Sequence, residues 1–442
     1  MENPFYFKME AYTSFTMTSM IIEHLQKRGL LEAITSDELI NLLQKPTKVY
    51  LGFDPTADSL HIGHLVGMII LRWFQKFGHT PVVVLGGATA RIGDPSGKST
   101  ERPLLDAQTI ASNINAVIKQ FEQVLDFSNP STRPLILNND QWFKEYASID
   151  FLRDVGKYFR LGVMLAKDSV KTRLSSEEGI SFTEFSYQLL QAYDFYRLYT
   201  DHNVQVQLGG SDQWGNITSG IDFIRKKISA QVFGYTFPLL TRSDGRKFGK
   251  TEQGTIWISK DRCSAYQFYQ YFYRIQDTEV IRLMRMLTFM ELEEIAEYEQ
   301  AIKSSDYVPN TAQKRLAEEV TRLIHGNAGL QIAQKVTQCL APGGEAILEF
   351  DVLREISAAD MPIKYVKHSE LVGQKYIDVS VKIGLVSSKS EAARLIHNNG
   401  AYLNNQKIHD INFLIEPGMA IKEQFLIFGS GKRKKILVSI KK

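Results

Sequence analysis

The 442-residue sequence contains only two cysteines, Cys263 and Cys339. Two thiols cannot form a disulfide framework, and they cannot by themselves complete a zinc site. Long apolar runs are also lacking. No stretch reaches the length of a membrane-spanning helix, and the first residues have no apolar core typical of a signal peptide. We therefore expect a cytoplasmic protein with no membrane partner and no bound metal site of its own.

Excess charge is small over the whole chain, with 52 basic and 49 acidic residues and a net charge of +3. Its distribution is uneven, however. From Lys375 to the C-terminus there are 12 lysines and arginines against 5 acidic residues, so this part carries +7 and the rest of the chain −4. A basic module on a mildly acidic body suggests a nucleic acid bound at one end, although a solvated lysine-rich terminus has the same composition.

What the sequence does contain is a strand-to-helix transition at residues 48–64. Lys48–Phe53 is short, apolar and rich in β-branched or aromatic residues, and an Asp-Pro pair ends it, as expected for a strand. A helix begins a few residues later, so His61 and His64 project from one face of its N-terminus. The unpaired N–H groups there suit a phosphate chain, and Gly63 leaves room for a flat ring. Two surface histidines or a metal pair are the alternatives, but no nearby cysteine or glutamate completes a metal site.

Two glycine-rich loops could bring further charges to the same ligand. Residues 93–99 resemble a phosphate-binding P-loop, but the first glycine of that motif is missing. The loop still offers Asp94 as a fixed anion and Lys98 and Arg102 as cations. Residues 244–251 are glycine-rich and basic, which would allow two lysines to reach a polyphosphate. A surface turn would look similar.

An aromatic helix at 182–199 carries the next candidates. Tyr187, Gln191 and Asp194 recur at helical spacing on one apolar face, which is how a small pocket fixes a polar ligand. The alternative is a buried aromatic helix in which Asp194 pairs with an arginine. Further on, Asp212 follows a strand and a Gly-Gly turn, where ribose hydroxyls could reach it. A simple helix N-cap is an equally good interpretation of Asp212 alone.

Strands alternate with helices over most of the chain, which predicts a parallel sheet with ligands beyond the carboxyl ends of its strands. The expected fold class is α/β, with a Rossmann-like parallel-sheet domain followed by a helical domain and a small α+β domain. The expected boundaries are 1–35 for an N-terminal extension and helix, 36–262 for the Rossmann-like domain, 263–350 for the helical domain, 351–374 for a linker and 375–442 for the basic domain.

Five segments occur together in this order: YLGFDPTADSLHIGH, GGATARIGDPSGK, SFTEFSYQLLQAYDF, GGSDQWGNI and KFGKT. From about Lys48 to the C-terminus, they resemble the bacterial-type tyrosyl-tRNA synthetases, a family of class I aminoacyl-tRNA synthetases. His-Ile-Gly-His corresponds to the HIGH signature of that class, and KFGKT stands in the place of its KMSKS loop. Residues 1–18 lie outside the family pattern. Leu51 stands where some members carry a small residue near the ribose. The C-terminal module resembles a small RNA-binding module also found in a ribosomal protein.

The resemblance implies a tyrosine–tRNA ligase that activates tyrosine with ATP, releases pyrophosphate and transfers tyrosine to the 3′-terminal adenosine of tRNA(Tyr). ATP would be a substrate that carries Mg²⁺ with it, and a homodimer is expected. The catalytic residues it implies are Thr56, His61, His64, Lys98, Arg102, Lys247, Lys250 and Thr251. Tyrosine would be bound by Tyr50, Asp94, Tyr187, Gln191, Asp194, Gln207 and Gln213. ATP would be bound by Gly52, Asp54, Gly63, Asp212 and Lys250.

The resemblance also makes residues 263–350 a tRNA-binding domain and residues 375–442 an RNA-binding domain. RNA would contact Lys389, Arg394, Lys432, Arg433, Lys434 and Lys435. Two other functions remain possible at this point. A tryptophanyl-tRNA synthetase shares the fold and signature, but Tyr50 with Asp194 would form a pair that reads a phenol. A non-enzymatic RNA-binding regulator would need only the basic module, and the intact ATP motifs argue against it.

Overall fold

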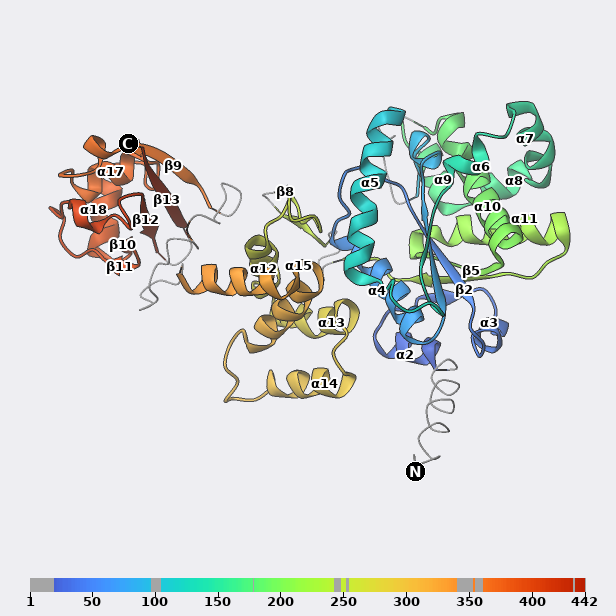
Figure 1. Ribbon diagram of the computed structural model, residues 1–442, viewed down its shortest axis with the longest axis horizontal. Coiled ribbons are helices and arrows are strands. Elements are labelled where there is room, and N and C mark those ends of the chain that lie inside the picture. Colours follow the sequence, from blue (N-terminus) through green and yellow to red (C-terminus); the bar gives the residue numbers. More distant parts are fainter. Residues whose placement is uncertain are drawn as a thin grey trace, which may run out of the picture. The chain divides into compact units, whose positions relative to one another are not determined.

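The computed structural model describes residues 20–96, 105–177, 179–241, 248–251, 254–339, 353, 361–431 and 434–441 (Figure 1). The chain forms two compact units. One consists of Met1–Ser259 with Gln276–Tyr307, and the other of Lys260–Ile275 with Val308–Lys442. None of the helices within the described ranges is both long and apolar enough to cross a membrane.

A six-stranded sheet forms the centre of the first unit, in the order β1-β6-β5-β2-β3-β4. The strands are β1 (Ala33–Ile34), β2 (Lys48–Phe53), β3 (Thr80–Leu85), β4 (Leu135–Asn138), β5 (Val204–Gly210) and β6 (Phe233–Phe237). All neighbouring pairs are parallel except β1 with β6. Residues 81–85 of β3 are apolar and buried without interruption, as expected for a parallel strand covered on both faces. The expected α/β parallel sheet is therefore confirmed.

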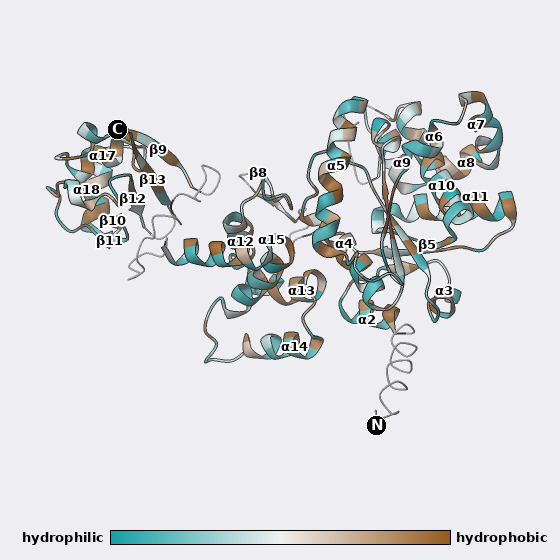
Figure 2. Cartoon of the chain, viewed as in Figure 1, coloured by the Kyte–Doolittle hydropathy of each residue, from teal (hydrophilic) through white to brown (hydrophobic). Residues whose placement is uncertain are grey.

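Helices cover both faces of this sheet (Figure 1). On one side lie α4 (Ile62–Lys76) and α5 (Ala107–Val124), with α2 (Ile21–Lys27) packed on α4 and α3 (Glu38–Leu42) leading into β2. On the other side lie α10 (Phe182–His202) and α11 (Trp214–Ile228), which bury Phe195 and Phe223 against Tyr50, Val82 and Val84. In Figure 2 the ribbon of α5 shows the apolar and polar stripes of an amphipathic helix.

Four short helices connect β4 to α10: α6 (Asp140–Phe143), α7 (Ser148–Asp154), α8 (Leu161–Leu165) and α9 (Asp168–Leu174). A buried ion pair fastens the last of them to α10, because an Arg173 Nη lies 2.6 Å from a carboxylate oxygen of Glu184. The hydroxyl of the N-cap Ser181 accepts from the backbone N–H of the same Glu184. These two contacts hold the first turn of α10, the helix that carries three predicted site residues.

Two helices of the segment predicted as helical, α13 (Asp277–Leu287) and α14 (Leu292–Ala301), belong to the first unit. Arg28, the residue directly after α2, connects them to the rest of this unit. Its guanidinium donates to the carbonyls of Thr288 (3.2 Å) and Met290 (2.6 Å) and lies 4.2 Å from the centre of the Trp73 ring. Burial lowers the pKa of Arg28 to about 10. The predicted 263–350 domain therefore contributes to both compact units.

The second unit contains α12 (Ala265–Tyr273) and α15 (Thr311–Cys339), which is kinked at Gly326. It also holds a five-stranded sheet in the order β11-β10-β12-β13-β9. Its elements are β9 (Ile363–Lys367), β10 (Ala401–Leu403), β11 (Gln406–Lys407), β12 (Phe425–Ser430), β13 (Lys434–Lys441), α17 (Tyr376–Lys382) and α18 (Lys389–His397). The expected small α+β module is therefore present.

The prediction of a linker at 351–374 is wrong for its second half. Residues of β9 pair in parallel with β13, with Ile363 opposite Leu437, and Val366 lies in the same core as Tyr376. Met361 is buried in a second core on the other face of the sheet. The C-terminal module therefore begins near Met361 rather than at Lys375. A parallel pairing with a strand some seventy residues away leaves no local pattern that sequence reading could detect.

Candidate active site

A cavity of about 450 Å³ lies at the carboxyl ends of β2, β3 and β5 in the first unit. It is the place where a parallel sheet is expected to bind ligands, because the strand order reverses around β2. Its lining includes most of the predicted site residues that the structure describes: Tyr50, Gly52, Asp54, Thr56, His61, Gly63, His64, Asp94, Tyr187, Gln191, Asp194, Asp212 and Gln213.

The two histidines of the α4 N-terminus form one end of the cavity. Their rings are stacked with centres 3.9 Å apart, as their spacing predicts. His61 is the N-cap: its Nδ1 accepts from the N–H of Gly63 (3.0 Å), while Nδ1 of His64 accepts from the N–H of His61 (3.2 Å). In a neutral imidazole whose Nδ1 accepts, Nε2 carries the proton. Both rings can thus present an N–H donor to an anion.

Gly63 is required by the same turn. A Cβ atom at this position would lie 2.8 Å from Cε1 of His61, so any side chain would displace the capping imidazole. The backbone next to Gly63 is hydrogen-bonded to residues 256–258. The N–H of Ile62 donates to the carbonyl of Ile256, and the N–H of Ile258 donates to the carbonyl of Leu60. The chain that follows the KFGKT segment is therefore fastened to the start of α4.

Asp194 closes the opposite end of the cavity, and it is only 5% exposed. Its carboxylate accepts from Nδ2 of Asn139 (3.1 Å) and from Nε1 of Trp142 (2.8 Å). Burial raises its pKa to about 8 although both hydrogen bonds act in the other direction. The described contacts of Asp194 include no arginine, so the alternative of a structural ion pair is not supported.

Tyr50 stands beside this carboxylate and is 2% exposed. Its hydroxyl has no hydrogen-bond partner within the described ranges, and burial together with the charge of Asp194 raises its pKa well above the usual value. Gln207 lies opposite Tyr50 in the register of β2 and β5, and its Oε1 is also buried without a described partner. Buried polar atoms without partners are costly, and they point to a missing polar ligand at this end.

A hydrogen-bonded network occupies the side of the cavity. Asp94 accepts from Nε2 of Gln213 (2.7 Å), whose Oε1 accepts from Gln191 (3.1 Å). The hydroxyl of Tyr187 donates to Asp54 (2.9 Å), and burial is the main cause that raises the pKa of Tyr187. Two carboxylates held by neutral donors make this side of the cavity suited to a cation.

The remaining wall is apolar. Leu51 packs over Gly67, and Phe237, Leu239, Leu240 and Phe248 continue the surface. Asp212 also lines the cavity here, in a 3₁₀ turn (Ser211–Gln213) directly after β5. The N-cap position of α11 is Gln213, with no capping side-chain hydrogen bond among the described residues, so the alternative interpretation of Asp212 as the N-cap is not supported. An apolar slot with one carboxylate fits a flat base and its sugar.

Several predicted residues cannot be placed in this cavity. Lys98, Arg102 and Lys247 lie outside the described residues. Lys250 and Thr251 form the short strand β7 (Lys250–Thr251), paired with β8 (Gly254–Thr255), but their side chains are outside the description. Phe248, between the predicted cations, is buried and lines the cavity.

Comparisons with known proteins agree with this geometry. A family model described as class I tRNA synthetases (W and Y) matches residues 42–341, and a model of the tyrosine–tRNA ligase SYY-like C-terminal domain matches residues 355–438. A tyrosine–tRNA ligase of Protochlamydia amoebophila is 54% identical over 420 residues, which cover 95% of this chain and 99% of the relative. The chain belongs to the tyrosine–tRNA ligases.

Other relatives extend this result. The chloroplastic/mitochondrial tyrosine–tRNA ligase of Arabidopsis thaliana is 47% identical, over 95% of this chain and 83% of the relative. A crystal structure of a C-terminally truncated mitochondrial tyrosyl-tRNA synthetase from Aspergillus nidulans superposes with a TM-score of 0.64 at 31% identity, covering 73% of this chain and 97% of the other. The expected fold, enzyme class and two-step aminoacylation of tRNA with tyrosine are thereby confirmed.

Sequence reasoning missed the residues that hold Asp194. Asn139 and Trp142 come from the end of β4 and from α6, more than fifty positions before it. Asn139 also donates to the hydroxyl of Thr89 (3.0 Å), which in turn donates to Asp54 (2.8 Å). The one available signal was the position of Asn139 directly after a predicted strand, at the sheet edge where ligands bind.

The predicted RNA-binding residues of this tyrosine–tRNA ligase chain lie in mixed surroundings. Lys389 forms an ion pair with Asp378 (2.7 Å) at the start of α18. Lys435 donates to Oδ1 of Asn405 (2.9 Å), and burial lowers its pKa to about 8. Lys434 begins β13 and is exposed, whereas Lys432 and Arg433 lie outside the described residues.

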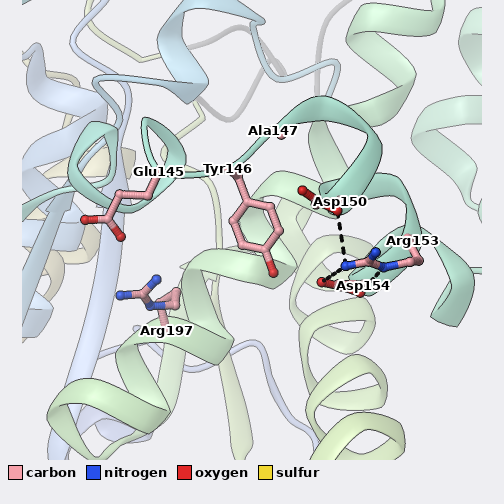
Figure 3. A pocket seen from close by; sticks show the side chains of 7 residues that line it. All are labelled: Glu145, Tyr146, Ala147, Asp150, Arg153, Asp154 and Arg197. Carbon is pink, nitrogen blue, oxygen red and sulfur yellow. Dashed lines mark hydrogen bonds and ion pairs between the residues drawn. The ribbon is translucent and has the colours of Figure 1, made fainter.

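A second cavity of about 340 Å³ lies beside α7, and its lining residues include none of the predicted site residues (Figure 3). Its lining is formed by Glu145, Tyr146, Ala147, Asp150, Arg153, Asp154 and Arg197. Arg153 pairs with both Asp150 (3.1 Å) and Asp154 (2.9 Å), as the dashed lines in Figure 3 show. Because these charges neutralise one another at the surface, we assign no role in catalysis to this cavity.

Proposed function

We propose that the large cavity holds tyrosine between Asp194 and the Asp94 network, with ATP along the α4 N-terminus and the apolar wall. In the first step a carboxylate oxygen of tyrosine forms a bond to the α-phosphorus, and the bond from that phosphorus to the bridging oxygen of pyrophosphate breaks. In the second step a ribose hydroxyl of the terminal adenosine of tRNA(Tyr) attacks the carbonyl carbon, and AMP leaves. The attacking carboxylate of the first step needs no general base.

The observation that carries the tyrosine site is the buried pair Tyr50–Asp194. A phenol hydroxyl can accept from the hydroxyl of Tyr50, which has no partner within the described residues, and can donate to the carboxylate of Asp194 beside its bonds from Asn139 and Trp142. At the other end of the amino acid, Asp94, Tyr187 and Gln191 are assigned to its ammonium group. Gln207 and Gln213 are assigned to the side of its carboxylate.

Catalysis then rests on placing the reactants and stabilising negative charge. The Nε2–H groups of His61 and His64 and the hydroxyl of Thr56 face the phosphates, and Gly52 and Gly63 allow the nucleotide to approach the backbone. Asp54 lies on the nucleotide side and Asp212 is assigned to the ribose. We propose that the leaving pyrophosphate is bound by Lys98, Arg102, Lys247, Lys250 and Thr251. Mg²⁺ is proposed to enter with ATP, held by its phosphates.

An apolar surface on the first unit supports the proposed homodimer. Seven large apolar side chains between residues 149 and 182 are exposed: Ile149, Leu152, Leu161, Val163, Leu165, Leu174 and Phe182. Phe182 and Ile149 are each 75% exposed. A concentration of this kind is typical of a surface that a partner covers, and a second copy of the chain is the proposed occupant.

The second unit is proposed to bind tRNA. The net charge of +7 after Lys375 supports binding of an RNA backbone, and the match to a tyrosine–tRNA ligase C-terminal domain agrees with a role in this reaction. The exposed lysine and arginine side chains of Lys389, Arg394 and Lys434, with Lys432, Arg433 and Lys435, are the assigned contacts. We place the enzyme in the cytoplasm, where its substrates would be present.

The assignment is tested by exchange of labelled pyrophosphate into ATP in the presence of single amino acids. Tyrosine should support exchange, and phenylalanine should be at least about 10-fold worse in kcat/KM, because it leaves the buried hydroxyl of Tyr50 unpaired, at about 1–3 kcal/mol, and offers no donor to Asp194. Equal exchange with phenylalanine would contradict the phenol site. Tyr50→Phe and Asp194→Asn should each narrow the preference.

Lys250 is tested separately in the same assay. Lys250→Ala should lower kcat with little change in the tyrosine KM, since a cation that meets charge developing on pyrophosphate acts in the transition state. A loss of about 2–4 kcal/mol is in line with removing one such group. If only the KM for ATP rises, Lys250 is a ground-state ligand instead.

A further inference from the structure

The edge of the C-terminal sheet carries an exposed tyrosine that no role above explains. Tyr365 lies on β9, the outermost strand next to β13, and it is 64% exposed. The ammonium group of Lys441 lies 5.1 Å from the centre of its ring. An aromatic ring on an edge strand is a liability for solubility, so its exposure calls for a reason.

The register of the two strands places further lysines around this ring. Tyr365 is opposite Ser439, and Lys367 is opposite Lys441. Because side chains alternate along a strand, Tyr365, Lys367 and Lys441 share one face of the sheet. Nearer the start of β9 the same face is apolar, where Ile363 and Leu437 pack in the core that includes Met361. The exposed end is therefore aromatic and basic.

The positive charge of this end is not balanced by ion pairs. Within the described residues, no carboxylate lies within ion-pair distance of the ammonium groups of Lys367 or Lys441, and both lysines are exposed. The nearest acidic side chain along the chain, Glu370, pairs with Lys382 (2.8 Å) and also accepts from the backbone N–H of Lys367 (3.1 Å), so its charge offsets part of that of Lys367 but lies apart from Lys441. Proteins bind single-stranded nucleotides with an exposed aromatic ring that has lysines beside it, because the base stacks on the ring and the lysines lie near the phosphates.

This surface is separate from the predicted RNA contacts at the start of β13. Lys434 begins that strand, whereas Lys441 ends it seven residues later, roughly 23 Å away at the usual rise of a strand. One RNA that touches both places must therefore extend along the whole strand.

We infer that Tyr365, with Lys367 and Lys441, forms a second RNA-binding surface on which an unpaired nucleotide of the tRNA stacks. This inference rests on the proposed binding of tRNA by the second unit. An acidic protein partner is the competing occupant, but an exposed ring among the cations favours a base over a carboxylate.

The test measures binding of tRNA(Tyr) by the full chain, with pyrophosphate exchange as the check that the enzyme is folded. Tyr365→Leu should weaken binding by about 5- to 100-fold, while Tyr365→Phe should stay within about twofold, because stacking needs the ring and not the hydroxyl. Exchange should be unchanged in both variants, since no residue assigned to it lies in the second unit. Equal binding by Tyr365→Leu and the unmodified chain would overturn the inference, as would equal losses in both variants.

Charge is tested with a matched pair of variants. Lys441→Gln should reduce the slope of log Kd against log salt by about 0.7 to 0.9, the value for one lost phosphate contact. Lys407→Gln removes the same charge from β11, at the opposite edge of the sheet, and should leave both binding and slope unchanged. Equal effects of the two variants would show that only overall charge matters, which contradicts a defined surface.

A further variant separates this inference from the function it rests on. Neutralising Lys434 and Lys435 together should weaken tRNA binding if the second unit binds RNA at all. If that variant binds weakly and Tyr365→Leu binds normally, the unit binds RNA without the surface on β9. If both bind normally, the proposed role of the second unit is wrong.

Discussion

Replacing Trp142 by phenylalanine tests the proposal that Asp194 recognises a phenol. The indole Nε1 donates to Oδ1 of Asp194 at 2.8 Å in a buried setting, and this bond favours the ionised carboxylate. Phenylalanine keeps most of the ring volume and removes the donor alone. The pKa of Asp194, already raised to about 8 by burial, should therefore rise further.

The size of this effect follows from the hydrogen bond. A bond to a charged group is worth about 1.5–3 kcal/mol, which corresponds to roughly one to two pKa units. If tyrosine donates its hydroxyl to the ionised form, Trp142→Phe should lower kcat/KM for tyrosine by about 10- to 100-fold at pH 7. The deficit should shrink as the pH rises toward 9, because the carboxylate then ionises in both enzymes.

The measurement is pyrophosphate exchange at limiting tyrosine, from pH 6 to pH 9, expressed as the ratio of variant to unmodified enzyme. This ratio cancels the titration of tyrosine itself. Trp214→Phe is the matched control, since Trp214 is 39% exposed and does not line the cavity. A deficit that is the same at every pH would refute the reasoning, because Trp142 would then act on packing and not on the ionisation of Asp194.

Three further outcomes are expected. Unfolded Asp194 ionises near pH 3.8 and the folded residue near pH 8, so the folded state binds the extra proton and stability falls with pH by at most about 1.4 kcal/mol per unit in that window. In thermal unfolding without tyrosine, the Tm of Asp194→Asn should therefore rise relative to the Tm of the unmodified chain from pH 5 to pH 8. Parallel curves of Tm against pH would contradict the raised pKa of Asp194. Gly67→Ala would place a Cβ 2.6 Å from Cδ2 of Leu51, so kcat/KM for ATP should fall by a factor equivalent to about 1–3 kcal/mol. Adding Leu51→Ala to that variant should restore part of the lost kcat/KM. If Gly67→Ala alone leaves kcat/KM unchanged, Leu51 has room to move. Ending the chain at residue 360 should keep pyrophosphate exchange and abolish aminoacylation, and full charging by the shortened enzyme would mean that the basic module is dispensable.

Local spacing was sufficient to predict the parts of the site that one element builds. His61 and His64 are three residues apart at a helix N-terminus, so helix geometry alone places their rings together, and the structure stacks them. The same holds for Tyr187, Gln191 and Asp194 on α10, all of which line the cavity. Their meeting with β2 and β5 follows from the alternation of strands and helices, which leaves few possible topologies.

Contacts between segments far apart in the chain could not be predicted from the sequence. The parallel pairing of β9 with β13 joins residues more than seventy positions apart, and the exposed side chains of Lys364, Tyr365 and Lys367 around a single buried Val366 do not resemble a core strand. Leu51 stood out in the sequence because of its size, but the space that accepts it is created by Gly67 on another element. Each of these depends on two segments whose patterns are unremarkable when read separately.

Asp194 shows why this missing information matters for function. A buried aspartate on an aromatic helix is compatible with a structural ion pair or with a binding site, and the two differ only in the partner. An arginine would neutralise the charge and hold the pKa low, leaving nothing for a ligand to do. The partners that the fold supplies are instead a neutral amide and a neutral indole, from Asn139 and Trp142. They orient the carboxylate without neutralising it, and burial then raises its pKa to about 8. In the proposed site, a phenol hydroxyl that enters between Asp194 and Tyr50 would offset part of the free-energy cost of burying these groups, and this is why we propose that they favour tyrosine over an amino acid of similar shape without the hydroxyl.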